Sequence, residues 1–116
     1  MVTDNRQVRE IVVAKLDDIP PGGMLPITVD KRPLLLCRLE DRVFAVGAIC
    51  PHRGAPLAEG RLHGALLRCP WHGISFDIRT GHRICAPECA DLKVYTVTVK
   101  EKCVWLALPD TQGVVK

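Results

Sequence analysis

The sequence contains two short motifs, CPHRGAPL at residues 50–57 and CPWHG at residues 69–73. Each motif places one cysteine and one histidine on a segment rich in glycine and proline. Two thiolates and two imidazoles can complete the coordination of a metal centre, and this donor set suits zinc or an iron–sulfur cluster. A C-x-H motif followed by C-x-x-H is unusual for a structural zinc finger, whose cysteines usually pair with cysteines. The mixed pairs favour an iron–sulfur centre, and a structural zinc-binding interaction module remains the alternative from another class.

The sequence around these motifs is typical of an all-β protein. Short runs rich in Val, Ile, Leu and Thr recur between clusters of Pro, Gly and Asp, and none keeps a helical period over three turns. In residues 94–99, apolar residues alternate with Tyr and Thr, which predicts a strand with one buried and one wet face. Strands are predicted at Val8–Lys15, Leu25–Val29, Leu34–Leu39, Val43–Val46, Ala65–Cys69, Ile74–Asp77, Lys93–Val99 and Cys103–Leu108.

The length of 116 residues predicts one domain spanning residues 1–116. Residues 47–89 hold all four histidines and four of the six cysteines, on a segment too irregular for framework and too short to fold alone. We expect this segment to be an insertion that binds the metal centre and is carried by a β-sandwich. Residues 109–116 are expected to form a loosely held tail.

Composition excludes several classes of protein. With 47% hydrophobic and 25% charged residues, the chain does not match a disordered or fibrous protein. The net charge of +3 and the five aromatic residues offer little for nucleic acid. The apolar runs are too short to span a membrane, and residues 1–10 lack the apolar core of an export signal. We therefore expect a cytoplasmic protein, in which cysteines bind metals or do redox chemistry more often than they form disulfides.

The two motifs also match the ligation of a [2Fe–2S] centre in which two histidines replace two cysteines on one iron. With Phe76-Asp77, Thr80-Gly81 and the strands near residues 92–108, they make the sequence resemble the Rieske iron–sulfur proteins, specifically the small soluble Rieske-type ferredoxins. The resemblance covers nearly the whole chain. It implies an antiparallel Rieske-type β-sandwich with an inserted cluster-binding subdomain and one [2Fe–2S] cluster. Its implied ligands are Cys50 and Cys69 on one iron, and His52 and His72 on the other.

The resemblance also bears on the redox potential. Two ferric irons, two sulfides and two thiolates carry no net charge, so adding an electron costs less than in a cluster with four thiolates. The respiratory Rieske branch has an additional disulfide, at the positions of Ala55 and Trp71, and two hydroxyl groups that hydrogen-bond the cluster. Here the hydroxyl positions hold Ile74 and Phe76, whose side chains donate no hydrogen bond. We therefore predict a potential near the low end of the Rieske range, roughly −150 mV.

A low-potential Rieske centre resembles the ferredoxin component of a bacterial ring-hydroxylating dioxygenase system. This resemblance implies a one-electron carrier between an NAD(P)H-dependent reductase and a terminal oxygenase, monomeric or weakly associating and not an enzyme by itself. The sequence has no facial triad for mononuclear iron and no dinucleotide-binding fingerprint. The alternative is the Rieske small subunit of an assimilatory nitrite reductase. Many of those relatives have lost cluster ligands, whereas all four are present here.

For several other residues near the motifs, the sequence allows more than one role. Trp71 lies between two ligands, where it either shields the cluster or forms part of a docking surface. Pro87 and Cys89 are expected to cover the cluster, although Cys85 and Cys89 could instead form a second metal site.

Residues farther from the ligands favour simpler roles. His63 and His82 are expected to be solvated loop residues, and Cys37 and Cys103 to be small buried hydrophobes in strands. Five arginines form either a solvated face or a surface that steers an acidic partner. They are Arg53, Arg61, Arg68, Arg79 and Arg83.

Overall fold

The computed structural model describes residues 8–51, 54–70, 74–84 and 90–109. Within these ranges the chain forms ten strands and two short 3-10 helices, η1 (Leu16–Asp18) and η2 (Leu57–Glu59). The strands are β1 (Val8–Lys15), β2 (Met24–Val29), β3 (Arg32–Leu39), β4 (Arg42–Gly47), β5 (Arg61–His63), β6 (Leu66–Arg68), β7 (Ser75–Asp77), β8 (Arg83–Ile84), β9 (Val94–Lys100) and β10 (Cys103–Pro109). The predicted all-β fold is confirmed.

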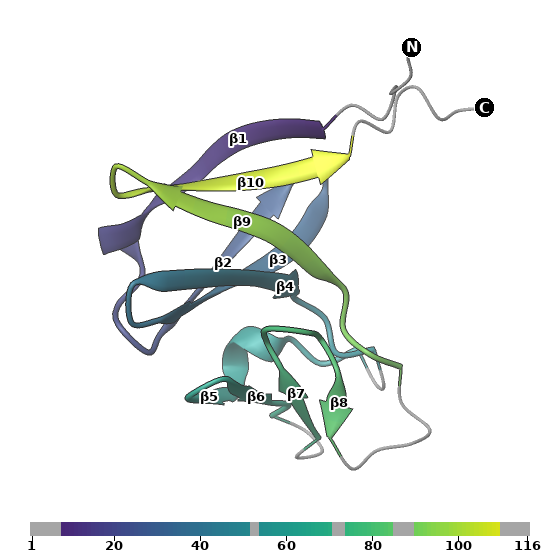
Figure 1. Cartoon of the computed structure of the whole chain (residues 1–116). Coiled ribbons are helices and arrows are strands. Elements are labelled where there is room, and N and C mark those ends of the chain that lie inside the picture. The colour runs from purple at the N-terminus through teal and green to yellow at the C-terminus, as the bar shows by residue number, and fades with distance from the viewer. Residues whose placement is uncertain (1–7, 52–53, 71–73, 85–89, 110–116) are drawn as a thin grey trace, which may run out of the picture.

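The larger sheet is antiparallel and has the strand order β1-β10-β9-β4-β3-β2. In Figure 1, β1, β10 and β9 lie over β2, β3 and β4, so the two halves of the sheet face each other. Leu106 of β10 and Leu36 of β3 are both fully buried in the core between these halves. The sheet therefore encloses its own apolar core, as the two layers of a sandwich do.

Strand β3 is buried on both of its faces. Leu34 and Leu36 belong to the core of the larger sheet, whereas Leu35 and Cys37 belong to a second core shared with the smaller sheet. Successive side chains of a strand point to opposite faces. The uninterrupted apolar run at residues 34–37 thus reflects a strand between two cores.

The smaller sheet has the order β5-β6-β7-β8 and is inserted between β4 and β9. The two strands that flank the smaller sheet in the sequence, β4 and β9, pair with each other. Ala45 lies opposite Tyr95, and Val46 lies opposite Val94. Figure 1 shows the smaller sheet as a separate layer below the larger one. The smaller sheet therefore leaves the framework sheet continuous.

All eight predicted strands are present, and their ends differ from the prediction by at most two residues. Strands β5 and β8, of three and two residues, were missed because neither lies in an apolar run or alternation of the kind that located β6 and β7. Pro33 precedes the predicted strand Leu34–Leu39 but lies in β3, opposite Thr28. The turn before β3 is formed by Asp30 and Lys31, with φ angles of 52° and 68°, as expected for a two-residue hairpin.

Two further differences concern the C-terminal hairpin. β10 continues through Pro109, which the sequence assigned to the tail. In β9 the predicted alternation is confirmed, with Tyr95 and Val97 half-buried and Thr96 exposed, but Val94 lies on the exposed face.

The only helices among the described residues are single 3-10 turns, and neither has the length or apolarity to span a membrane.

Candidate metal centre

The two cysteines of the motifs begin two loops that are closed in the same way. The N–H of Cys50 donates to the carbonyl of Ala55 over 2.8 Å, and the N–H of Cys69 donates to the carbonyl of Ile74, also over 2.8 Å. Each bond spans five residues and brings the two ends of its loop together. The first loop follows β4, and the second connects β6 to β7. Two segments that are distant in the sequence thus share the same closing hydrogen bond.

The first loop has further support at its base. Ile49 forms a β-bridge with Pro56, and the N–H of Leu57 donates to the carbonyl of Ala48 over 2.9 Å. Gly54 has a φ of +79°, in the left-handed region that favours glycine, and its N–H donates to the Cys50 carbonyl over 2.8 Å. These bonds hold Cys50 at the start of a tight turn.

Both cysteines are buried in the core between the two sheets. Cys50 is 1% exposed and Cys69 is 2% exposed. They share this core with Leu57, Leu67 and Phe76, each completely buried. Folding therefore brings together two thiol groups that are far apart in the sequence, and surrounds them with apolar side chains.

The other predicted site residues divide into two groups. Ile74 is half-buried and packs against the same core, while Phe76 lies inside it on β7. The predicted ligands His52 and His72 lie outside the described residues, so the structure does not test the four-residue ligand set. The described residues also exclude Arg53, Trp71, Cys85, Pro87 and Cys89.

The described half of the site fits a metal cluster held by thiolates. None of the four described cysteines forms a disulfide, so Cys50 and Cys69 are not bridged in that way. The core around them contains no buried charged side chain among the described residues. Thiolates are soft ligands that suit zinc and iron–sulfur clusters, and an apolar surrounding limits access of water to the metal.

Cys37 lies in the same core but on β3 rather than on a loop. Burial raises the pKa of its thiol to about 12, so the group stays protonated at neutral pH. Its predicted role as a small buried hydrophobe is confirmed. Cys103, by contrast, is only half-buried at the start of β10, so the same prediction was too strong there.

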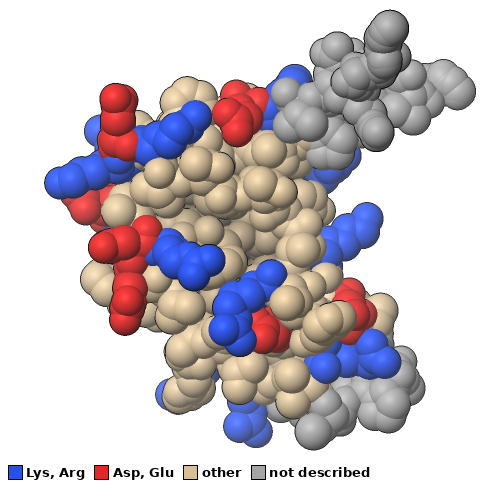
Figure 2. Space-filling model, in the orientation of Figure 1, with Lys and Arg blue, Asp and Glu red and all other residues tan. Residues whose placement is uncertain are grey.

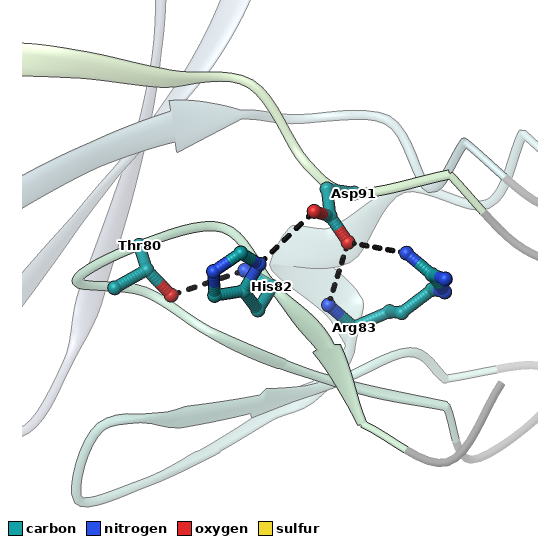
Figure 3. Close-up of polar contacts among 4 residues, drawn as sticks. All are labelled: Thr80, His82, Arg83 and Asp91. Atoms are coloured by element: carbon teal, nitrogen blue, oxygen red, sulfur yellow. Dashed lines mark hydrogen bonds and ion pairs between the residues drawn. The ribbon is translucent and has the colours of Figure 1, made fainter. Parts of the chain in front are cut away.

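The connection from the smaller sheet to β9 is held by Asp91. Figure 3 shows His82, which directly precedes β8, and Arg83, the first residue of β8, converging on its carboxylate. Asp91 accepts hydrogen bonds from the backbone N–H of Arg83 at 3.0 Å and from its guanidinium at 2.9 Å, and His82 Nδ1 lies 3.0 Å away. These contacts, led by the backbone bond, lower the pKa of Asp91 to about 2. His82 is therefore exposed, as expected, but has a partner.

Nearby, the Gly81 carbonyl accepts the N–H of Leu92 over 2.8 Å, in parallel with the Asp91 contacts. The two interactions fasten the turn between β7 and β8 to the segment that enters β9. Sequence reasoning missed this connection, because its only local signal is a glycine in a Thr-Gly turn.

The arginines predicted as one group have different surroundings. Arg79 donates to Asp77 and lowers the pKa of that carboxyl, while Arg83 is paired with Asp91. Arg61 and Arg68 lie directly opposite each other on β5 and β6, and both are exposed. His63 is also exposed, although it ends β5 instead of lying in a turn.

Known proteins that are similar to this chain point to the same iron–sulfur chemistry. The model of the Rieske [2Fe-2S] domain matches residues 9–96. The ferredoxin component of the naphthalene 1,2-dioxygenase/salicylate 5-hydroxylase systems of Ralstonia sp. is 34% identical, over 84% of this chain and 94% of its own length.

Two solved structures are also similar. The ferredoxin of carbazole 1,9a-dioxygenase from Nocardioides aromaticivorans IC177 has a TM-score of 0.79 and 31% identity, over 87% of this chain and 98% of that one. A ferredoxin solved in complex with the oxygenase of carbazole 1,9a-dioxygenase has a TM-score of 0.77 and 34% identity, over 84% of this chain and 92% of that one. These matches favour an iron–sulfur cluster over the zinc alternative.

Proposed function

This chain belongs to the Rieske [2Fe–2S] domain family, and from that premise we propose that it passes single electrons from an NAD(P)H-dependent reductase to a terminal oxygenase. The observation that carries the proposal is the pair of buried cysteines, Cys50 and Cys69, on two loops with the same closing hydrogen bond. The likeness to ferredoxin components of dioxygenase systems extends over most of the chain. The protein is then an electron-transfer component and not itself the catalyst of oxygenation.

The proposed ligands are Cys50 and Cys69 for one iron, and His52 and His72 for the other. Residues 47–89 act as the cluster-binding subdomain of a single domain over residues 1–116. When bound, the cluster supplies a site that accepts and donates one electron at a time.

The residues around the two thiols affect the access of water to the cluster and its redox potential. Leu57, Leu67 and Phe76 exclude water from the buried side of the loops. Neither Ile74 nor Phe76 has a side-chain hydrogen-bond donor, which would favour the reduced, more negative form of the cluster. We therefore propose a potential near the low end of the Rieske range, roughly −150 mV.

The proposed location is the cytoplasm. Cys37, Cys69 and Cys103 form no disulfide, which is compatible with a reducing compartment.

The function is tested by reconstituting electron transfer with purified components. Holoprotein is combined with the reductases and terminal oxygenases of naphthalene and carbazole dioxygenase systems, and formation of hydroxylated product is measured. Product should depend on this chain, and Cys69→Ser should abolish both product and the EPR signal of the reduced cluster. Cys37→Ala, a change in the same core, should retain both.

Other results would contradict the proposal. If no oxygenase turns over, and the protein instead copurifies with a large sirohaem protein and supports nitrite reduction, the nitrite reductase subunit is the correct assignment. Protein that contains zinc without iron and sulfide would exclude electron transfer altogether.

A further inference from the structure

A surface groove of about 940 Å³ lies where β4 leaves the larger sheet and β9 enters it. Ile49 and Pro51 of the first cysteine loop line one part, and Lys93 and Val94 at the start of β9 line another. Arg32, at the start of β3, also lines the groove. Figure 2 shows Lys and Arg side chains beside a hollow on the right-hand side of the molecule, where Figure 1 places the ends of these strands.

The groove exposes two large apolar side chains. Ile49 is 46% exposed and Val94 is 44% exposed. Val94 lies on the exposed face of β9, whose next two outward positions are Thr96 and Thr98. Because Val94 is apolar, it adds apolar surface to the groove, and it belongs to neither core. Grouped exposed apolar side chains of this kind often mark a protein-binding site.

The groove also carries positive charge without an internal counterion. Neither Arg32 nor Lys93 forms an ion pair with any of the described residues. Asp91 lies in the lining, but its carboxylate is already bonded to His82 and Arg83. A partner that fits the groove therefore needs an apolar projection with carboxylates beside it.

We propose that this groove receives the terminal oxygenase, which inserts an apolar side chain against Ile49 and Val94 and places carboxylates opposite Arg32 and Lys93. The proposal rests on the proposed function and names the surface used in its final step. Pro51 in the groove directly precedes the proposed ligand His52. An oxygenase docked here would contact the same loop that holds the cluster, which keeps the path for the electron short.

The test compares charge reversals at two lysines. Lys93→Glu changes the groove, whereas Lys102→Glu makes the same change in net charge at the exposed turn between β9 and β10. Val94→Thr removes apolar character while nearly preserving shape. For each holoprotein, the Kd for the oxygenase that turns over in the reconstitution is measured by calorimetry, beside the rate of reduction by the reductase. The visible spectrum of the cluster reports whether each variant is intact.

We expect Lys93→Glu to raise the Kd for the oxygenase at least about fivefold, and Lys102→Glu to change it less than about twofold. Val94→Thr should raise the Kd about threefold, and added salt should reduce the effect of Lys93→Glu only. Reduction by the reductase should be unchanged in all three variants.

Three results would overturn the proposal. Equal effects of the two lysine reversals would mean that only net charge matters. An effect on the reductase step alone would place the reductase in the groove. Unchanged binding by the groove variants, together with weaker binding by Arg61→Glu, would place the oxygenase on the outer face of the smaller sheet. Each leaves the proposed function standing, because that function is tested on the unmodified protein, by its metal content and by turnover with an oxygenase.

Discussion

Replacing Gly81 by alanine should destabilise the protein much more than replacing Gly64, another glycine with a positive φ in a turn of the smaller sheet. Gly81 has a φ of +84°, and a Cβ at this position would lie 2.3 Å from the carbonyl oxygen of Leu92. Gly64 provides the matched control. Its φ is +58°, but an added Cβ would have no neighbour within 4 Å. Both substitutions carry the cost of a left-handed residue, and only Gly81→Ala also carries the clash.

The expected magnitudes follow from these two terms. A non-glycine residue in the left-handed region costs roughly 1 kcal/mol, which is the whole effect expected for Gly64→Ala. Relieving the contact at Gly81 requires the Leu92 backbone to move, which adds about 1–3 kcal/mol for overpacking and about 1 kcal/mol for the lost Leu92 hydrogen bond. The free energy of unfolding should thus fall by about 3–5 kcal/mol in Gly81→Ala.

The assay is thermal unfolding of the holoproteins, followed by circular dichroism at one fixed heating rate. At about 4 °C per kcal/mol for a chain of this size, Tm should fall by roughly 4 °C in Gly64→Ala and by roughly 12–20 °C in Gly81→Ala. Cluster absorbance at 25 °C should also decay faster in Gly81→Ala, because this turn is tied to the segment entering β9. Equal losses of Tm in the two variants would refute the reasoning, since the close approach to Leu92 would then contribute nothing.

Three more changes have defined outcomes. The pKa of Asp91 is lowered to about 2, so its contribution to stability is complete above the unfolded pKa of about 3.9 and is lost as the pH falls toward 2. The Tm difference between the unmodified protein and Asp91→Asn should therefore shrink as the pH falls from 5 toward 3, and a constant difference over that range would contradict this account. With a pKa of about 12, Cys37 should not react with a thiol reagent at pH 8 until the protein unfolds, and rapid labelling of the folded protein would show that it is accessible. Ile74→Ser should raise the midpoint potential of the cluster by tens of millivolts by supplying a hydroxyl donor, and an unchanged redox titration would mean that the hydroxyl does not reach the cluster.

Much of the fold could be predicted from local patterns. The apolar runs and turn residues located all the strands longer than three residues, because such strands show a recognisable pattern within a few positions. The two-residue strand β8 and the three-residue strand β5 carry no such pattern. They are strands because β7 and β6 lie beside them, and that neighbourhood exists only in the folded chain.

The candidate metal centre, too, was predictable from the sequence only in part. The sequence by itself predicted the donor chemistry, because Cys50 and Cys69 lie in two mixed Cys/His motifs whose side chains are able to bind a metal whatever their surroundings. Only the tertiary structure decided that both thiols are buried in one apolar core, that Asp91 and Gly81 tie the smaller sheet to the start of β9, and that Val94 faces a groove. Ligand identity resides in individual side chains, whereas burial, close approach and exposure depend on which distant segments the folded chain brings into contact.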